Sequence, residues 1–170
     1  MSFAPRAVLV GLFLTLSVGP AAAYTVIKNG QGNTKAWTTS TVEWRISSSL
    51  DIGFTIGDLQ PSFEAAFDAW QDVDCTTIVF SYEGTTGGNP HQGVYIRSNS
   101  GSGWNPSTSD TLAYTTSKSS NGGAINESAI VFNGIQSWAL TTPTPVGYSD
   151  IQAVLTHEIG HAIGLDHSRH

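Results

Sequence analysis

Near its C-terminal end the chain reads His157-Glu158-Ile159-Gly160-His161-Ala162-Ile163-Gly164-Leu165-Asp166-His167. On a helix, His157 and His161 lie one turn apart on the same face, where two neutral imidazoles can share one zinc ion. Because glycine accepts a left-handed backbone, Gly164 predicts the end of that helix and a turn that returns His167 as a third ligand. Three protein ligands leave the fourth position for water, as in catalytic zinc sites.

The glutamate inside this motif makes a catalytic interpretation more specific. Glu158 follows the first histidine and can reach a water on the metal without binding the metal itself. The alternatives are a histidine-rich helix end that faces solvent and histidines that stabilise the helix C-terminus by their charge. Chance produces the full pattern on the order of once in a hundred thousand chains of this size. We therefore favour a metal site over both alternatives.

Two segments have the periodicity of amphipathic helices. The first covers residues 61–72, which Asp58 or Ser62 can cap. The second covers residues 149–163 and carries the histidine motif; Ser149 can cap it, and Asp150 suits its positive end. The predicted core faces are Phe63, Ala66, Phe67 and Trp70 in the first helix and Ile151, Val154, Leu155, Ile159 and Ala162 in the second.

Strands are predicted before the first helix and between the two helices. Alternation of Val42, Trp44 and Ile46 with polar residues predicts a half-buried strand over residues 41–47. Further strands are expected at residues 76–82, 94–97, 112–116 and 127–133, separated by glycine-rich loops at 83–92 and 98–110. This order predicts an α+β domain, an α/β sandwich with the sheet on one side of the helices.

The first 23 residues predict a cleaved signal peptide. Arg6 precedes an apolar run over residues 7–18, and Ala21-Ala22-Ala23 provides a small-residue cleavage pattern. The alternative, a membrane anchor, is disfavoured because the run is shorter than the ~20 residues that span a bilayer. We therefore expect residues 24–170 to be a secreted, extracellular domain with no membrane span after cleavage.

Composition narrows the possible functions further. The 170 residues include 7 Lys and Arg against 13 Asp and Glu, for a net charge of −6. This balance argues against a nucleic-acid partner, because nucleic-acid binders usually carry a basic face. The single cysteine, Cys75, excludes an internal disulfide and is either a buried thiol or half of an intermolecular bond. We expect one domain and a monomer.

The long histidine motif resembles that of the metzincin zinc endopeptidases, and Ser168 after the third histidine resembles the matrixin branch. Four other segments agree with it. Residues 63–72 look like the first family helix, and residues 111–114 are similar to the edge strand that pairs with substrate backbone. Residues 125–133 look like the next strand, and residues 150–156 resemble the approach to the zinc motif. The resemblance covers most of residues 37–168 and implies a mixed twisted sheet packed on two long helices.

The resemblance implies a secreted endopeptidase acting on protein or peptide substrates. His157, His161 and His167 would hold a catalytic zinc ion (Zn²⁺). Glu158 would be the general base that takes a proton from the attacking water and passes it to the leaving amine. A structural calcium ion (Ca²⁺) is a further possibility. Candidate residues for such structural sites are Asp110 and Glu127, whereas the loop residue His91 is expected to be a surface histidine.

Two departures from the family are apparent. No PRCGxPD-like propeptide motif precedes the domain, so the sequence does not support latency through a cysteine switch. The family continues past the third histidine to a methionine turn, whereas here only Met1 is a methionine and His170 is the last residue. We therefore expect a matrixin-like domain that lacks its C-terminal subdomain, with His167 poorly braced and zinc weakly held.

Three functions stay open at this point. The first is an active secreted zinc endopeptidase. The second is a truncated peptidase domain that is catalytically weak or inactive and binds zinc or peptide without turnover. The third is an extracellular binding module, which only the loop-rich composition favours.

Overall fold

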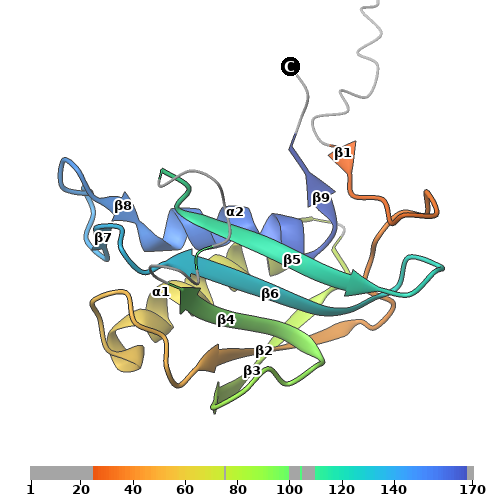
Figure 1. Cartoon of the computed structure of the whole chain (residues 1–170), viewed down its shortest axis with the longest axis horizontal. Coiled ribbons are helices and arrows are strands. Elements are labelled where there is room, and N and C mark those ends of the chain that lie inside the picture. Colours follow the sequence, from red (N-terminus) through yellow and green to blue (C-terminus); the bar gives the residue numbers. More distant parts are fainter. Residues whose placement is uncertain (1–24, 75, 100–103, 105–109, 168–170) are drawn as a thin grey trace, which may run out of the picture.

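The computed structural model describes residues 25–74, 76–99, 104 and 110–167 (Figure 1). Its main sheet has five strands in the order β3-β2-β4-β6-β5. β5 runs antiparallel to β6, and the other neighbouring strands are parallel. These strands are β2 (Thr41–Ser47), β3 (Val79–Thr86), β4 (Gly93–Asn99), β5 (Ala113–Ser119) and β6 (Ile125–Asn133).

Two helices, α1 (Ile56–Gln71) and α2 (Ile151–Ala162), pack on one face of this sheet (Figure 1). Two small pairs of strands lie next to the two ends of α2. β7 (Trp138–Ala139) pairs with β8 (Ser149–Asp150) just before α2, and β1 (Thr25–Val26) pairs with β9 (Leu165–Asp166) just after it. The predicted α+β sandwich with a mixed sheet and two helices is confirmed. No helix in the described part of the chain is long and apolar enough to cross a membrane.

The core lies between the sheet and the helices. The alternation predicted for residues 41–47 is confirmed, because Val42, Trp44 and Ile46 are at most 2% exposed. Trp44 stacks on Phe67 of α1 with ring centroids 4.3 Å apart. The remaining predicted core positions of the two helices are also buried, apart from Trp70 and Val154, which are partly exposed and pack against the same cluster. Burial of these large side chains is the main force that holds the helices on the sheet.

The predicted start of the first helix was wrong. α1 begins at Ile56 rather than residue 61, and its cap is Thr55 rather than Asp58 or Ser62. Thr55 Oγ1 accepts a hydrogen bond from the Asp58 backbone, and the Asp58 carboxylate accepts one from the Thr55 backbone. This reciprocal capping box satisfies two amides at the helix start. Pro61 therefore lies beyond the first turn.

The strands predicted at residues 94–97, 112–116 and 127–133 are observed as Gly93–Asn99, Ala113–Ser119 and Ile125–Asn133. Two further boundary shifts have structural reasons. The strand predicted at residues 76–82 is observed as Val79–Thr86, because it continues alongside β2 from Thr41 to Ser47. Gly84, with φ of 79°, accommodates an extra residue in this pairing, so a residue that signals a loop instead lies in a bulge. α2 begins at Ile151, and its cap is Asp150, which accepts a hydrogen bond from Ala153, rather than Ser149.

Candidate metal centre

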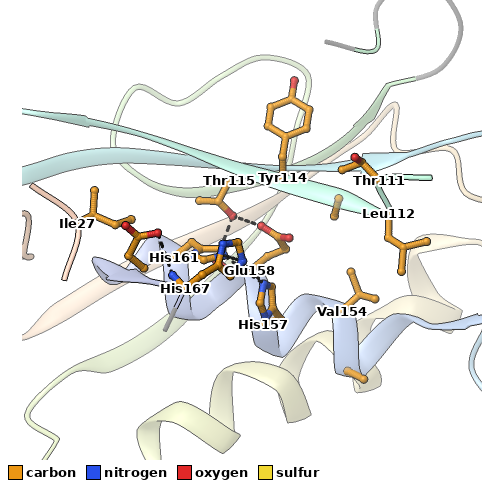
Figure 2. A pocket seen from close by; sticks show the side chains of 13 residues that line it. Ile27, Thr111, Leu112, Tyr114, Thr115, Val154, His157, Glu158, His161 and His167 are labelled. Carbon is orange, nitrogen blue, oxygen red and sulfur yellow. Dashed lines mark hydrogen bonds between the residues drawn. The ribbon is translucent and has the colours of Figure 1, made fainter. Parts of the chain in front are cut away.

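The structure brings the three histidines of the motif together at the C-terminal end of α2 (Figure 2). His157 and His161 project from successive turns of the helix, and His167 follows the turn after it. Each pair of Nε2 atoms is 3.1 Å apart. Among the described residues, this is the one group of three histidine, cysteine or acidic side chains whose ligand atoms converge.

Gly164 makes this convergence possible. α2 ends at Ala162, and the Gly164 amide donates a hydrogen bond to the His161 carbonyl at 3.0 Å. Gly164 has φ of 103°, a conformation that side-chain-bearing residues rarely adopt. A Cβ atom there would also lie 2.2 Å from the carbonyl oxygen of Lys35. The predicted role of Gly164 in ending the helix and reversing the chain is confirmed.

The hydrogen bond of His161 determines which of its nitrogens faces the cluster. Its Nδ1 lies 2.7 Å from the carbonyl oxygen of Leu165. Because a carbonyl can only accept, Nδ1 carries the proton, and Nε2 of the neutral ring presents its lone pair to the other histidines. Such a second contact is the usual way in which a protein orients a metal-binding imidazole.

The protonation of His157 also suits a metal ligand. Partial burial, together with the neighbouring His161 and His167, lowers the pKa of His157 below its ordinary value. The carboxylate of Glu158 opposes this shift without cancelling it. A lowered pKa favours the neutral imidazole, which is the form that binds metal ions.

The spacing of the three nitrogens fits a single zinc ion. A tetrahedral zinc ion with bonds of about 2.0–2.1 Å separates its ligand atoms by about 3.3 Å. The observed separations of 3.1 Å are close to this value. Three imidazole nitrogens are also a donor set that zinc prefers, and they leave a coordination position open.

Glu158 lies next to this cluster but points toward the sheet (Figure 2). It is only 6% exposed. Thr115 of β5 donates a hydrogen bond from Oγ1 to Glu158 Oε2 at 2.6 Å, and the same hydroxyl lies 3.1 Å from the Glu158 carbonyl oxygen. A short hydrogen bond to a carboxylate is among the stronger ones in proteins and holds the acid in one orientation.

Sequence reasoning missed Thr115. The strand predicted over residues 112–116 places Ala113 and Thr115 on one face and Leu112 and Tyr114 on the other. Leu112 and Tyr114 are the larger apolar pair, so the alternation gave no reason to expect that Thr115 would face α2. The one available sign of a role for Thr115 was its place on an edge strand next to the proposed cleft.

A cleft of about 760 Å³ runs between β5 and α2 (Figure 2). One wall comes from residues 111–115, and the other comes from Ala153, Val154 and the histidine motif. β5 is the last strand of the sheet, and in the described part of the chain no strand pairs with its outer edge. The predicted position of an edge strand beside the cleft is confirmed.

Two tryptophans hold α2 against the rest of the domain. Trp70 of α1 donates from Nε1 to the Thr156 carbonyl at 2.7 Å, and Trp37 donates to the Ala162 carbonyl at 3.0 Å. Gly160, inside the histidine motif, lies directly under the Trp70 ring, since a Cβ atom there would be 2.9 Å from Cζ2. Sequence analysis had predicted Trp70 as a core residue but had no signal for this contact with Gly160.

The expectation that His167 is poorly braced was wrong. β9, which immediately precedes His167, pairs with β1, with Thr25 opposite Asp166 and Val26 opposite Leu165. Thr25 Oγ1 also donates to the His167 carbonyl at 2.8 Å. The brace comes from the N-terminal segment, which sequence analysis had not assigned to any element.

The weaker candidates do not join the cluster. The His91 side chain is 78% exposed, as predicted, with Nδ1 3.5 Å from Glu127. The Glu127 carboxylate accepts hydrogen bonds from Asn89 at 2.7 Å and from the Lys118 ammonium at 2.9 Å. A lysine in this position competes with a cation, so the structure does not support calcium at Glu127. Asp110 is exposed.

Several predicted features lie outside the described residues. They are the signal peptide at residues 1–23, the thiol of Cys75, and Ser168 and His170. Trp104 is partly exposed. Its ring lies edge-on to Tyr114, a residue of the cleft, with centroids 5.3 Å apart.

Comparison with known proteins agrees with the geometry. A comparison with protein families matches residues 36–170 to Matrixin. A comparison with curated proteins finds no match. The matched span contains the whole five-stranded sheet, both helices and the three converging histidines. The chain therefore belongs to the matrixin family, whose members are zinc-dependent peptidases.

Proposed function

We propose that the chain is a secreted zinc endopeptidase in which His157, His161 and His167 hold the catalytic zinc ion and Glu158 is the general base. One observation supports this most directly: three Nε2 atoms converge within 3.1 Å of one another beside a buried carboxylate, in the wall of a cleft. Three imidazoles provide the ligands of a catalytic zinc site, and the adjacent carboxylate provides the proton acceptor that hydrolysis needs.

A zinc ion held there would supply Lewis acidity, activating a water molecule and polarising the scissile carbonyl. The protein supplies the proton transfers. Thr115 engages Oε2 of Glu158, so we assign proton transfer to Oε1. Glu158 accepts the proton of the attacking water and then donates it to the nitrogen of the departing amine. Because Thr115 holds the carboxylate in place, both transfers start from one orientation.

The substrate is proposed to be a protein or peptide bound in extended form. An extended peptide can add to the outer edge of β5 through backbone hydrogen bonds. Leu112, just before β5, and Val154 on α2 present apolar surface inside the cleft, where they can receive a substrate side chain. We further propose that residues 1–23 are a signal peptide and that residues 24–170 form the peptidase domain.

The test compares three forms of the purified chain: unmodified, Glu158→Gln and His161→Ala. We expect the unmodified chain to bind one equivalent of zinc and to cleave casein. Glu158→Gln should retain zinc and lose cleavage, because the amide keeps the shape of the side chain but cannot accept the proton. His161→Ala should lose both. Cleavage by Glu158→Gln would disprove the mechanism, and zinc binding without cleavage by the unmodified chain would favour a domain that binds without turnover.

A further inference from the structure

The N-terminal segment over residues 25–36, here named the N-terminal clamp, reaches β9, the strand that immediately precedes the third histidine (Figure 1). Three contacts join them. β1 pairs with β9, the Ile27 amide donates to the Gly164 carbonyl at 2.8 Å, and Thr25 Oγ1 donates to the His167 carbonyl at 2.8 Å. The clamp therefore holds the backbone from Gly164, in the turn after α2, to His167.

The clamp is itself fastened to the main sheet. Asn29 donates from Nδ2 to the carbonyl oxygens of Ser120 and Asn121, which lie in the turn between β5 and β6. Asn33 donates to the same Asn121 carbonyl at 2.7 Å. The clamp also closes on itself through a hydrogen bond from Lys35 to the Ile27 carbonyl at 2.8 Å. These bonds connect β9 to the same hairpin that carries Thr115.

The three histidines differ in what positions them. His157 and His161 are held by the helix, whereas His167 lies five residues beyond the last helical residue, Ala162. Ordering each residue of a mobile segment costs backbone entropy. If a segment becomes ordered only when a ligand binds, this cost makes the binding weaker. A clamp that orders residues 164–167 beforehand removes this cost.

We propose that the N-terminal clamp positions His167 and thereby sets the zinc affinity of the site. This inference rests on the proposed function, because it assumes that His167 is a zinc ligand. It assigns to residues 25–36, which lie almost entirely outside the segment matched to the family, a direct part in the metal site. The residues act through the backbone of β9 and are positioning residues that do not touch substrate.

The first test compares Ile27→Pro with Ile27→Val in the full chain. Proline removes the amide that bonds to Gly164 and disfavours strand pairing, whereas valine keeps the amide and the β-branched shape. Zinc affinity is measured by competition with a chromophoric chelator. We expect Ile27→Pro to bind zinc about 10- to 100-fold more weakly, the range typical when a contact that orients a ligand is lost. Ile27→Val should bind within about twofold of the unmodified chain.

A second pair of variants keeps the test informative if proline prevents folding. Thr25→Val removes the hydroxyl that bonds to the His167 carbonyl, and Thr25→Ser retains it. The expected loss for Thr25→Val is about two- to tenfold in zinc affinity, the equivalent of one hydrogen bond. Thr25→Ser should restore most of that loss.

Amide hydrogen exchange of residues 164–167, measured without zinc, tests the clamp separately from the proposed function. We expect faster exchange in Ile27→Pro and Thr25→Val than in their matched controls. Failure of the unmodified chain to bind zinc would disprove the proposed function, and exchange would still test the clamp. Equal exchange rates in each pair, or equal zinc affinities when the unmodified chain does bind zinc, would overturn the inference.

Discussion

Replacing Gly160 with alanine should destabilise the protein, although the same change in most helices is stabilising. Glycine inside a helix costs about 0.5–1 kcal/mol relative to alanine. At this position, however, the new Cβ would lie 2.9 Å from Cζ2 and 3.4 Å from Cη2 of Trp70. The indole cannot move aside freely, because its Nε1 donates to the Thr156 carbonyl at 2.7 Å.

The expected change in the free energy of unfolding follows from these two opposing effects. Forcing an extra methyl group into a well-packed contact costs about 1–3 kcal/mol. Subtracting the gain in helix propensity of about 1 kcal/mol leaves a net loss of about 0–2 kcal/mol in the free energy of unfolding. The coupling between Gly160 and Trp70 is a sharper quantity than this net loss. In a Trp70→Phe background, where the shorter ring leaves space, Gly160→Ala should stabilise by up to about 1 kcal/mol.

The assay is urea unfolding of the unmodified chain, the two single variants and the double variant. We expect a coupling free energy of about 1–3 kcal/mol from this cycle. Gly57→Ala in α1 is the matched control, because a Cβ there meets nothing closer than Thr55 Oγ1 at 3.8 Å. That control should be neutral or stabilising. If Gly160→Ala had the same effect in both backgrounds, within about 0.5 kcal/mol, the proposed contact would be refuted.

Three further predictions concern single residues. Thr115→Val should lower kcat about tenfold or more with zinc content unchanged, because it removes a hydrogen bond to the Glu158 carboxylate. Thr115→Ser keeps the hydroxyl and should retain most activity, so equal kcat values for the two variants would contradict this prediction. Gly164→Ala should lower unfolding stability by at least about 2 kcal/mol in urea, because of its positive φ and the nearby Lys35 carbonyl; an unchanged midpoint would contradict this. The third prediction concerns Glu127. Burial raises the pKa of its carboxyl, but hydrogen bonds from Asn89 and Lys118 outweigh burial, so the pKa lies below its ordinary value. The carboxylate therefore stabilises the fold above its unfolded pKa and loses this effect as pH falls, so unfolding measured from pH 7 to pH 3 should depend less on pH in Glu127→Gln.

Local patterns predicted much of the fold because they depend on backbone geometry over a few residues. The alternation of Val42, Trp44 and Ile46 identified a strand and its buried face, and the four-residue spacing of His157 and His161 placed both on one helix face. Boundaries were less predictable. Extension of β3 to Thr86 depends on its pairing with β2, which no local pattern describes.

The features of the candidate site likewise fall into those that local sequence predicts and those that it does not. The histidine pair on one helix face, the adjacent glutamate and the turn at Gly164 all follow from helix periodicity and from the freedom of one glycine, so the sequence by itself determined them. Only the tertiary structure decided what holds them in place. The hydrogen bond from Thr115 to Glu158 spans 43 residues, and the bond from Thr25 to His167 spans 142. Such contacts depend on which strand edge meets which helix, and that is settled by packing the whole sheet rather than by any local repeat.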